Sequence, residues 1–502
     1  MLRKIELKGE QKKVLFLPPS NPIQIKGVAG SGKTTVALYR AKHLIDTQNT
    51  LFQEAKVIIF TFNKTLAAYI KAVSPYINGG YQRDSDEIKP MTRDGLNVMI
   101  VNFHSWAYHF AGIKNGATIN SYEQKEMIVK AKRGLESTSS NILSKSDEFF
   151  QEEISWIKGK LFGSKSEYIE AKRAGRGTSD RVTAADKEVI WEVYTRYNQE
   201  LKKAGKVDFD DYAIKCLEKI ENNPSWVPPY THIIVDEAQD LNKAQILVIS
   251  KLVSEETKNI TIIADAAQRI YKSGFTWSEV GLNVRGGRTI ELKKNYRNTV
   301  HIFRAALSLL ANEKDKSEFT EAETALAGET LPVVGYFDGL GMQLEYLLQE
   351  INKLKEGGNI SNTIVLHRTN GGVREIANFL RRNGIEIELV RSSEPVNYYG
   401  DSVKICTMSS IKGLEFENVF IMDLTDSVIP YPQGFIDADD EFQISTERRL
   451  LYTCMTRAKA NLYLIADKHN PSRYLAEIDA NLLNNITKST TDDLIDFTTL
   501  QF

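Results

Sequence analysis

The stretch GVAGSGKTT, residues 27–35, constrains the fold more than any other part of the chain. It fits the pattern Gly-x-x-x-x-Gly-Lys-Thr, in which glycines let a loop bend so that its backbone N–H groups point at phosphate. The apolar run PIQIKGV before it suits a buried strand, and TTVALYRAKHLI after it has helical spacing. The helix N-terminus adds favourable partial positive charge. These flanks favour a strand–loop–helix unit over a chance glycine-rich turn.

The same loop carries candidate ligands for a triphosphate and its metal ion. Lys33 would reach the terminal phosphates, and Thr34 would hold Mg²⁺. The other candidate nucleotide-binding residues of the loop are Gly27, Ala29, Gly30, Ser31, Gly32 and Thr35.

A second signal is IIVDEAQD, an apolar strand that ends in Asp236 and Glu237. In a parallel α/β fold, the carboxyl end of this strand would lie beside the phosphate loop. Asp236 would hold Mg²⁺ through water, and Glu237 would position or deprotonate the attacking water. An Asp-Glu pair after a strand is common by itself, but together with the loop it indicates hydrolysis of ATP.

Composition limits the class of protein and its partners. A chain of 502 residues is too long for one compact core and suggests about two to four domains. The net charge of -1 means that a nucleic acid would have to be met by local basic surface. The three cysteines are scattered without metal-ligand spacing, which suggests a reducing compartment. With neither a signal peptide nor a bilayer-spanning run in the sequence, we expect a cytoplasmic protein without a membrane partner.

Apolar, β-branched runs alternate with helical patterns in two clusters, which predicts an α/β fold with two parallel-sheet domains. Between about 111 and 205 the sequence has no convincing strand, so a helical insertion into the first domain is expected. The expected limits are 1–110 and 206–284 for the first domain, 111–205 for the insertion, 285–470 for the second domain and 471–502 for a helical tail.

The expected insertion contains the basic stretch IKGKLFGSKSEYIEAKRAGRGTSDR, with seven Lys or Arg against three acids. Trp156, Phe162 and Tyr168 are interleaved with the charges. This mixture suits contacts to backbone phosphates and stacked bases. A solvated helical face explains the charges equally well.

The ordered series of motifs resembles the UvrD/Rep family of superfamily 1 helicases over nearly the full chain. Beyond the two motifs above, the segments that carry the resemblance are FTFNKTLA (60–67), NFHSWA (102–107), VDFDDY (207–212), ADAAQRIY (264–271), KKNYRNT (293–299), HRTNGGVREIANFL (367–380), TMSSIKGLEF (407–416) and ERRLLYTCMTRAKANLYL (447–464). The resemblance implies two RecA-like motor domains that bind ATP and Mg²⁺ between them.

The resemblance also implies roles for residues around the nucleotide. Gln11 would read adenine and Tyr296 would stack on it, while Glu415 would lie near the ribose. Gln268 would sense the terminal phosphate. Arg297 and Arg457 would act as arginine fingers, because a guanidinium stays charged and grips phosphate oxygens bidentately. A surface salt bridge is the alternative role for each arginine.

The candidate nucleic-acid contacts are Phe62, Asn63, His104, Trp277, Arg368 and Asn370. Phe103, Trp106 and Phe275 are further candidate stacking platforms, although aromatic side chains are more often part of the core. The lone histidines have no metal partners in the sequence, so no zinc is expected. In VDFDDY we expect the acids to have a structural or positioning role.

The chain departs from the family in ways that bear on function. Trp277 follows Tyr271 at a wider spacing than in relatives, and Ser278 and Ser409 replace the usual arginine and histidine. Asn370 and Thr407 are 37 positions apart, which leaves no room for the large helical insertion that relatives carry there.

Three functions remain open at this point. The chain could be an ATP-driven translocase or helicase that moves 3′ to 5′ on single-stranded or tailed DNA. It could be a nucleic-acid-gated ATPase switch that controls a protein partner, such as a nuclease or defence effector, without unwinding. It could also act on RNA.

Overall fold

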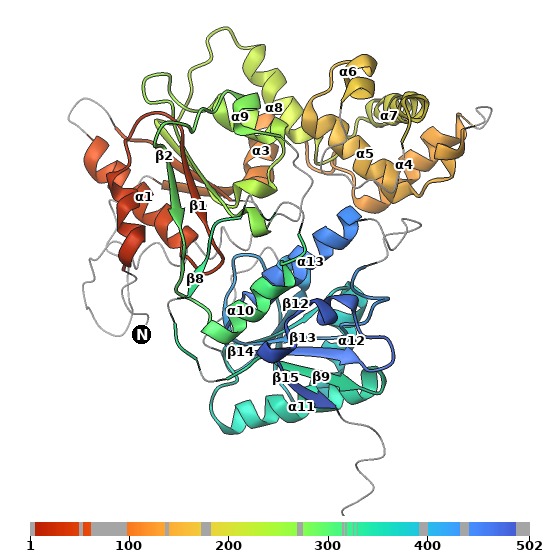
Figure 1. Ribbon diagram of the computed structural model, residues 1–502. Coiled ribbons are helices and arrows are strands. Elements are labelled where there is room, and N and C mark those ends of the chain that lie inside the picture. Colours follow the sequence, from red (N-terminus) through yellow and green to blue (C-terminus); the bar gives the residue numbers. More distant parts are fainter. Residues whose placement is uncertain are drawn as a thin grey trace, which may run out of the picture.

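Two all-parallel sheets form the framework of the chain in the computed structural model (Figure 1). The structure describes residues 6–49, 54–61, 98–135, 140–171, 182–268, 275–313, 316, 319–324, 326–328, 330–390, 400–431 and 441–487. The expected class, a pair of RecA-like α/β domains with a helical insertion in the first, is confirmed. Within the described ranges, no helix is both long and apolar enough to span a bilayer.

The first sheet has the strand order β3-β2-β4-β5-β1-β6. Its strands are β1 (Ile23–Gly27), β2 (Val57–Thr61), β3 (Val98–Asn102), β4 (His232–Val235), β5 (Asn259–Ala264) and β6 (Thr289–Leu292). Every residue of β2, β4 and β5 is buried, because helices cover both faces of the sheet. Alternate residues face opposite sides, so Val57 and Ile59 pack against α1, whereas Ile58 and Phe60 pack on the other face.

Helices surround this sheet. They are η1 (Gly9–Phe16), α1 (Lys33–Gln48), α3 (Phe103–Ala111), α8 (Asp211–Glu221), η4 (Ala238–Asp240), α9 (Lys243–Ser250), η5 (Ala266–Gln268) and η6 (Trp277–Val280). Since α1 follows β1, η4 follows β4 and η5 follows β5, the loops between them meet at the carboxyl edge of the sheet, where ligands bind in this type of fold.

The second sheet has the strand order β11-β12-β10-β13-β14-β9-β15. Its strands are β9 (Val333–Phe337), β10 (Thr363–His367), β11 (Ile387–Leu389), β12 (Val403–Thr407), β13 (Phe416–Ile421), β14 (Ala458–Asp467) and β15 (Asn484–Thr487). A separate pair, β7 (Lys294–Asn295) with β8 (Glu323–Thr324), lies in the crossing from the first sheet to the second.

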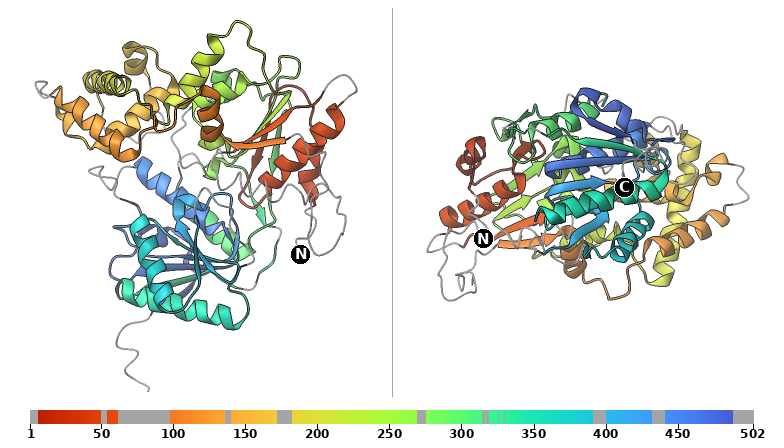
Figure 2. Two further views of the ribbon diagram at one scale, coloured as in Figure 1. Left: turned by 180° about the vertical axis from the view of Figure 1, so that it is seen from behind. Right: turned by 90° about the horizontal axis from the view of Figure 1, so that it is seen from below.

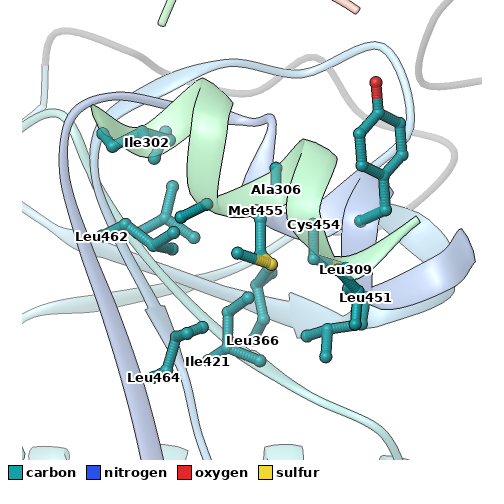
Figure 3. Packing of buried hydrophobic residues seen from close by; sticks show 14 of the residues in the cluster. Ile302, Ala306, Leu309, Leu366, Ile421, Leu451, Cys454, Met455, Leu462 and Leu464 are labelled. Atoms are coloured by element: carbon teal, nitrogen blue, oxygen red, sulfur yellow. The ribbon is translucent and has the colours of Figure 1, made fainter. Parts of the chain in front are cut away.

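One face of the second sheet is covered by α10 (Val300–Leu309) and α13 (Glu441–Met455), and the other by α11 (Gly339–Glu356) and α12 (Asn370–Arg382). Figure 3 shows side chains of the first face, namely Ile302, Ala306, Leu309, Leu451, Cys454 and Met455 from the helices with Leu366, Ile421, Leu462 and Leu464 from the strands. Because α13 also contacts η5, this face meets the first domain (Figure 1).

The helical insertion forms a lobe with its own core beside α9 (Figures 1 and 2). Its helices are α4 (Ser121–Arg133), η3 (Asn141–Ser144), α5 (Asp147–Lys160), α6 (Lys165–Glu170) and α7 (Ala184–Ala204). Trp156 and Tyr168 are buried in this core, so they are not available as stacking platforms. Helical spacing, with aromatics on the apolar face, accounts for them.

The lysines of the basic stretch that the structure describes are engaged with acids. Lys158 is buried and its Nζ lies 2.7 Å from Asp208 Oδ2 and 2.6 Å from Asp211 Oδ1. This contact ties α5 to the VDFDDY segment, which therefore has the structural role expected for it. Lys160 and Lys165 pair with Glu279 and Glu188. The part of the stretch from 172 to 181 lies outside the described residues.

The structure differs from two of the expected domain limits. Residues 289–292, expected in the second domain, form β6 and pair with β1 of the first sheet. Residues 473–487, expected as part of a helical tail, form the short helices η9 (Arg473–Glu477) and η10 (Ala480–Leu482) and then β15, which pairs with β9. In both places a short strand of low hydrophobicity gains its hydrogen bonds at a sheet edge, which local sequence signals do not reveal.

Candidate active site

The phosphate loop (residues 27–35) bends between β1 and α1 as its sequence predicts. Gly30 and Gly32 have φ angles of 70° and 80°, a region that glycine adopts without strain. A Cβ on Gly30 would lie 2.5 Å from Asn295 Oδ1, so the loop also needs glycine for this close approach. α1 begins at Lys33, and its first N–H groups therefore face the loop.

Lys33 is turned back onto its own loop. Its Nζ donates to the carbonyl oxygens of Gly27 and Val28 at 3.0 and 3.1 Å, and it lies 3.0 Å from Asp265 Oδ2. The side chains of Lys33 and Asp265 are both buried. The loop ammonium is thus already held by oxygen atoms, and a phosphate would have to replace them.

The strand-end carboxylates lie beside this loop. Thr34 Oγ1 donates to Asp236 Oδ2 at 2.9 Å, which brings together the two groups expected to hold Mg²⁺. Burial raises the pKa of Asp236 to about 7, and the adjacent Glu237 carboxylate adds to the rise. Burial opposes the ionisation of Glu237 as well, but Lys33 and two cations of the second domain outweigh it and lower its pKa.

Two arginines of the second domain face the phosphate loop. Arg457 Nη2 donates to Gln268 Oε1 across the domain boundary at 3.0 Å. Arg297 pairs with Glu415, and its Nη1 donates to the carbonyl oxygen of Thr456 at 3.4 Å. Burial lowers the pKa of Arg457, and the positive charge of Arg297 lowers it further. The two guanidinium groups, one buried and one half-buried, would be stabilised by an anion.

These groups line a single cavity between the two domains, here called the interdomain cleft. Its lining residues are Gly30, Gly32, Lys33, Thr34, Thr35, Leu38, Glu237, Gln268, Arg297, Gly413, Glu415 and Arg457. The structure thus brings the candidate catalytic residues and most of the phosphate loop together.

The candidate adenine-binding residues lie at one end of the loop. Gln11 is buried, and its Nε2 donates to the carbonyl oxygen of Ser31 at 2.7 Å, while its Oε1 accepts from Lys8 N. The backbone N–H of Tyr296 donates to the carbonyl oxygen of Gly30 at 2.9 Å. The Tyr296 hydroxyl lies beside Gly9, 2.8 Å from the position that a Cβ on this glycine would take. The Gln11 side chain and the Tyr296 backbone therefore contact the phosphate loop, whereas the Tyr296 hydroxyl lies near Gly9 of η1.

The candidate nucleic-acid contacts are less concentrated. Arg368 is not presented outward, because its Nε and Nη2 each donate to Glu447 at 2.8 Å. His104 Nε2 lies 3.3 Å from Gln245 Nε2. Asn370 is exposed at the first turn of α12. Phe62 and Asn63 lie outside the described residues.

Among the aromatic candidates, Phe103 and Trp106 belong to the core of the first domain, so they are not stacking platforms. Trp277 is half-buried, packs edge-on against Phe275 with ring centroids 5.5 Å apart, and lines an open groove that extends to Arg285. Of these four, Trp277 remains the candidate for contact with a base.

Two family models match the two parts of the chain described above. The model of the UvrD/REP helicase N-terminal domain matches residues 7–278. The chain belongs to the UvrD/Rep helicase family. The model of the UvrD-like helicase C-terminal domain matches residues 290–394 and 391–469.

Curated relatives are similar over much of the chain. An ATP-dependent DNA helicase PcrA of Leuconostoc citreum is 26% identical over 411 residues, covering 76% of this chain and 48% of the relative. DNA helicase II of Haemophilus influenzae is 26% identical over 417 residues, covering 78% and 51%. This UvrD/Rep chain therefore spans about half the length of the curated relatives it matches. A solved structure described as the C-terminal domain of a possible DNA helicase from Lactobacillus plantarum covers 38% of this chain and 98% of its own at 19% identity, with a TM-score of 0.29.

Four buried residues at the cleft of this UvrD/Rep chain escaped the sequence reasoning. Gln239 Nε2 donates to Glu237 Oε2 at 2.5 Å, and its Oε1 accepts from the N–H of Asp265 at 3.1 Å. Lys412 Nζ from the second domain lies 2.6 Å from Asp240 Oδ2 of the first. Gln239 and Asp240 directly follow Asp236-Glu237 in the motif, and this adjacency was the available signal. No sequence pattern indicated a partner for Asp265 or Lys412.

Proposed function

We propose that the chain is an ATP-dependent translocase or helicase on single-stranded DNA that moves 3′ to 5′ and hydrolyses ATP in the interdomain cleft. The proposal rests on family membership and on relatives named ATP-dependent DNA helicases. The observation that carries it is the cleft, which combines Lys33 and Glu237 of the first domain with arginines of the second. A nucleotide bound there would contact both domains.

The residues present fit a nucleotide with its metal ion. Among the described residues, Ser31 Oγ and Arg297 Nε are buried without a hydrogen-bond partner, and both belong to the groups expected around phosphate. Thr34 and Asp236 offer oxygen atoms of the kind that Mg²⁺ prefers. Bound there, Mg²⁺ would neutralise charge on the phosphate oxygens. Lys33 would exchange its contact with Asp265 for one with phosphate.

Glu237 is the proposed general base. Its lowered pKa keeps the carboxylate ionised near neutral pH, so that it can orient or deprotonate water. Gln239 holds one oxygen of Glu237 and leaves the other for water. Gln268 Oε1 accepts from Arg457 Nη2, so the proposed phosphate sensor is in direct contact with one proposed arginine finger.

Hydrolysis would be coupled to movement because residues of both domains line the cleft. An arginine finger contributes on the order of 10³–10⁵ in rate, so turnover would need the second domain in contact with the first. Opening and closing once per ATP would shift one domain relative to the other. If both domains hold a strand, this cycle produces steps along it.

The test is unwinding of a DNA duplex with a 3′ single-stranded tail, with Glu237→Gln as the inactive control. The proposal predicts ATP-dependent strand separation with a 3′ tail, little with a 5′ tail, and none for the control. Translocation is scored separately by ATP-dependent release of a protein block from the 5′ end of a single strand.

The alternative is a nucleic-acid-gated ATPase switch that controls a partner protein. It is favoured by the short interval between Asn370 and Thr407, whose described part consists of α12, β11 and β12. DNA-stimulated ATP turnover without either unwinding or translocation would support the switch and overturn the motor.

A further inference from the structure

Two asparagines lie where the chain crosses from the first sheet to the second. Asn295 ends β7, and Asn298 directly precedes the turn into α10. Both side chains are completely buried. Arg297, one of the two proposed arginine fingers, lies between them in the sequence. Asn295 and Asn298 are here called the asparagine pair.

The hydrogen bonds of Asn295 fix its orientation. Its Oδ1 accepts from the backbone N–H groups of Arg297 and Asn298 at 2.8 and 2.9 Å. Its Nδ2 therefore points the other way and donates to Asn298 Oδ1 at 2.7 Å. Since an amide has one acceptor end and one donor end, both side chains can take only this arrangement. The side chain of Asn295 thereby fixes the backbone at Arg297 and Asn298.

Asn298 extends the contact to the second arginine. Its Nδ2 donates to the carbonyl oxygens of Thr456, at 3.0 Å, and Ala458. These are the residues on either side of Arg457. The carbonyl of Thr456 also accepts from Arg297 Nη1 at 3.4 Å. The two arginines are thus joined through one short chain of hydrogen bonds, although 160 positions separate them in the sequence.

The same segment also contacts the phosphate loop. Tyr296 N donates to the carbonyl oxygen of Gly30 at 2.9 Å. Asn295 packs so closely on Gly30 that a Cβ there would collide with its amide oxygen. Hydrogen bonds therefore connect the backbone at Arg297 and Arg457 to the loop that would hold the phosphates.

We propose that the asparagine pair positions the two arginine fingers relative to each other and to the phosphate loop, and that it is required for ATP hydrolysis more than for ATP binding. The inference rests on the proposed function and assigns positioning residues beyond the groups that touch the nucleotide. Displacing a catalytic group by about 1 Å can lower a rate on the order of 10²-fold, so loss of this contact is expected to appear in kcat.

The test compares Asn298→Ala with a matched control, Asn418→Ala. Asn418 is also buried in the second domain, and its Nδ2 also donates twice, to Asn359 O at 3.2 Å and to Thr363 Oγ1 at 3.1 Å. Its partners lie on β10 and before it, away from the residues that line the cleft. The full chain is assayed for DNA-stimulated kcat, for the Kd of ATP in the Glu237→Gln background, and for Tm.

We expect Asn298→Ala to lower kcat by about 10- to 100-fold and to leave the Kd of ATP within about threefold. Asn418→Ala should lower Tm by a similar amount and keep kcat within about twofold of wild type, because it removes comparable hydrogen bonds elsewhere. In an Arg297→Ala/Arg457→Ala background, Asn298→Ala should slow the residual turnover by less than about threefold, since both groups that it positions are already gone.

The inference is overturned if Asn298→Ala keeps wild-type kcat, or if its effect multiplies in full with that of the Arg297→Ala/Arg457→Ala double variant. If Asn298→Ala fails to fold, the kcat of Asn298→Asp is measured in its place. Aspartate keeps the side-chain shape and the acceptor for Asn295 but lacks the donor to Thr456 and Ala458. Wild-type kcat in that variant overturns the inference. A wild-type chain without ATP turnover overturns the proposed function itself, whereas normal turnover in both asparagine variants overturns the inference alone.

Discussion

Replacement of Lys412 by methionine should weaken contact between the two domains without unfolding either of them. Lys412 Nζ lies 2.6 Å from Asp240 Oδ2 and 3.3 Å from the carbonyl oxygen of Gln268. The side chains of Lys412 and Asp240 are 2% and 0% exposed. Since they come from different domains, the ion pair is buried only while the domains are in contact.

The expected magnitude follows from the charge left behind. Removing one partner of a buried ion pair is unfavourable by about 3–5 kcal/mol, because the other charge remains desolvated and loses that partner. When the domains separate, Asp240 regains water, so the penalty falls on closure. At about 1.4 kcal/mol per factor of ten, the ratio of closed to open chains should fall by roughly two to three and a half orders of magnitude. ATP turnover, which we propose to require closure, should fall with it.

The assay is energy transfer between dyes on the two domains, measured alongside ATPase rate and Tm. The matched control is Lys404→Met, because Lys404 is buried and its Nζ donates to carbonyl oxygens of the second domain, those of Ser361, Gly400 and Ser402. Adding Asp240→Asn to Lys412→Met should restore part of the closure, since the desolvated carboxylate charge is then removed as well. Wild-type closure in Lys412→Met, an equal loss in the control, or further loss in the double variant would refute the reasoning.

Three further outcomes are expected. Arg457→Ala should slow hydrolysis by about 10³–10⁵ and change ATP affinity much less; equal losses in both would argue against a finger role. Trp277→Ala should weaken binding of single-stranded DNA by roughly 1–3 kcal/mol and leave basal ATPase intact; unchanged binding in a titration would show that the strand passes elsewhere. Burial lowers the pKa of His232 to about 4, so the neutral ring is favoured in the folded state and stability is lost as pH falls from 6.5 toward 4. At pH 5 this loss is about 2 kcal/mol, and chemical denaturation should show it reduced in His232→Gln.

The phosphate loop, the strand-end carboxylates and the alternation of strands and helices could be predicted from the sequence because each is a local pattern. Lys33 and Thr34 follow a glycine pattern in nine residues, and Glu237 follows an apolar strand. Chemistry that depends on residues close together in the chain can be recognised from the sequence pattern.

Side-chain partners from distant positions could not be predicted in this way. Asp265 is 232 positions from Lys33, and Lys412 is 172 positions from Asp240. The same limit explains Arg368, which matches a DNA-contacting stretch by motif but is bound to Glu447 in the structure. A charged residue in a motif has no visible partner until the fold brings one to it.

Burial also separates residues that look alike in the sequence. Phe103 and Trp277 are both aromatic residues in or beside motifs, yet Phe103 is fully buried next to Phe60 while Trp277 lines a groove. The sequence alone left both as possible stacking platforms. Strands β6 and β15 have too few apolar residues to be recognised before their sheets are known.

The proposed function requires that nucleic acid controls ATP hydrolysis in the interdomain cleft. Its most direct test is the steady-state ATPase rate of the full chain without nucleic acid, with single-stranded DNA and with single-stranded RNA, using Glu237→Gln as the blank. We expect strong stimulation by DNA, weaker stimulation by RNA and no turnover in the blank. Equal rates under all three conditions, or turnover that survives in Glu237→Gln, would contradict it.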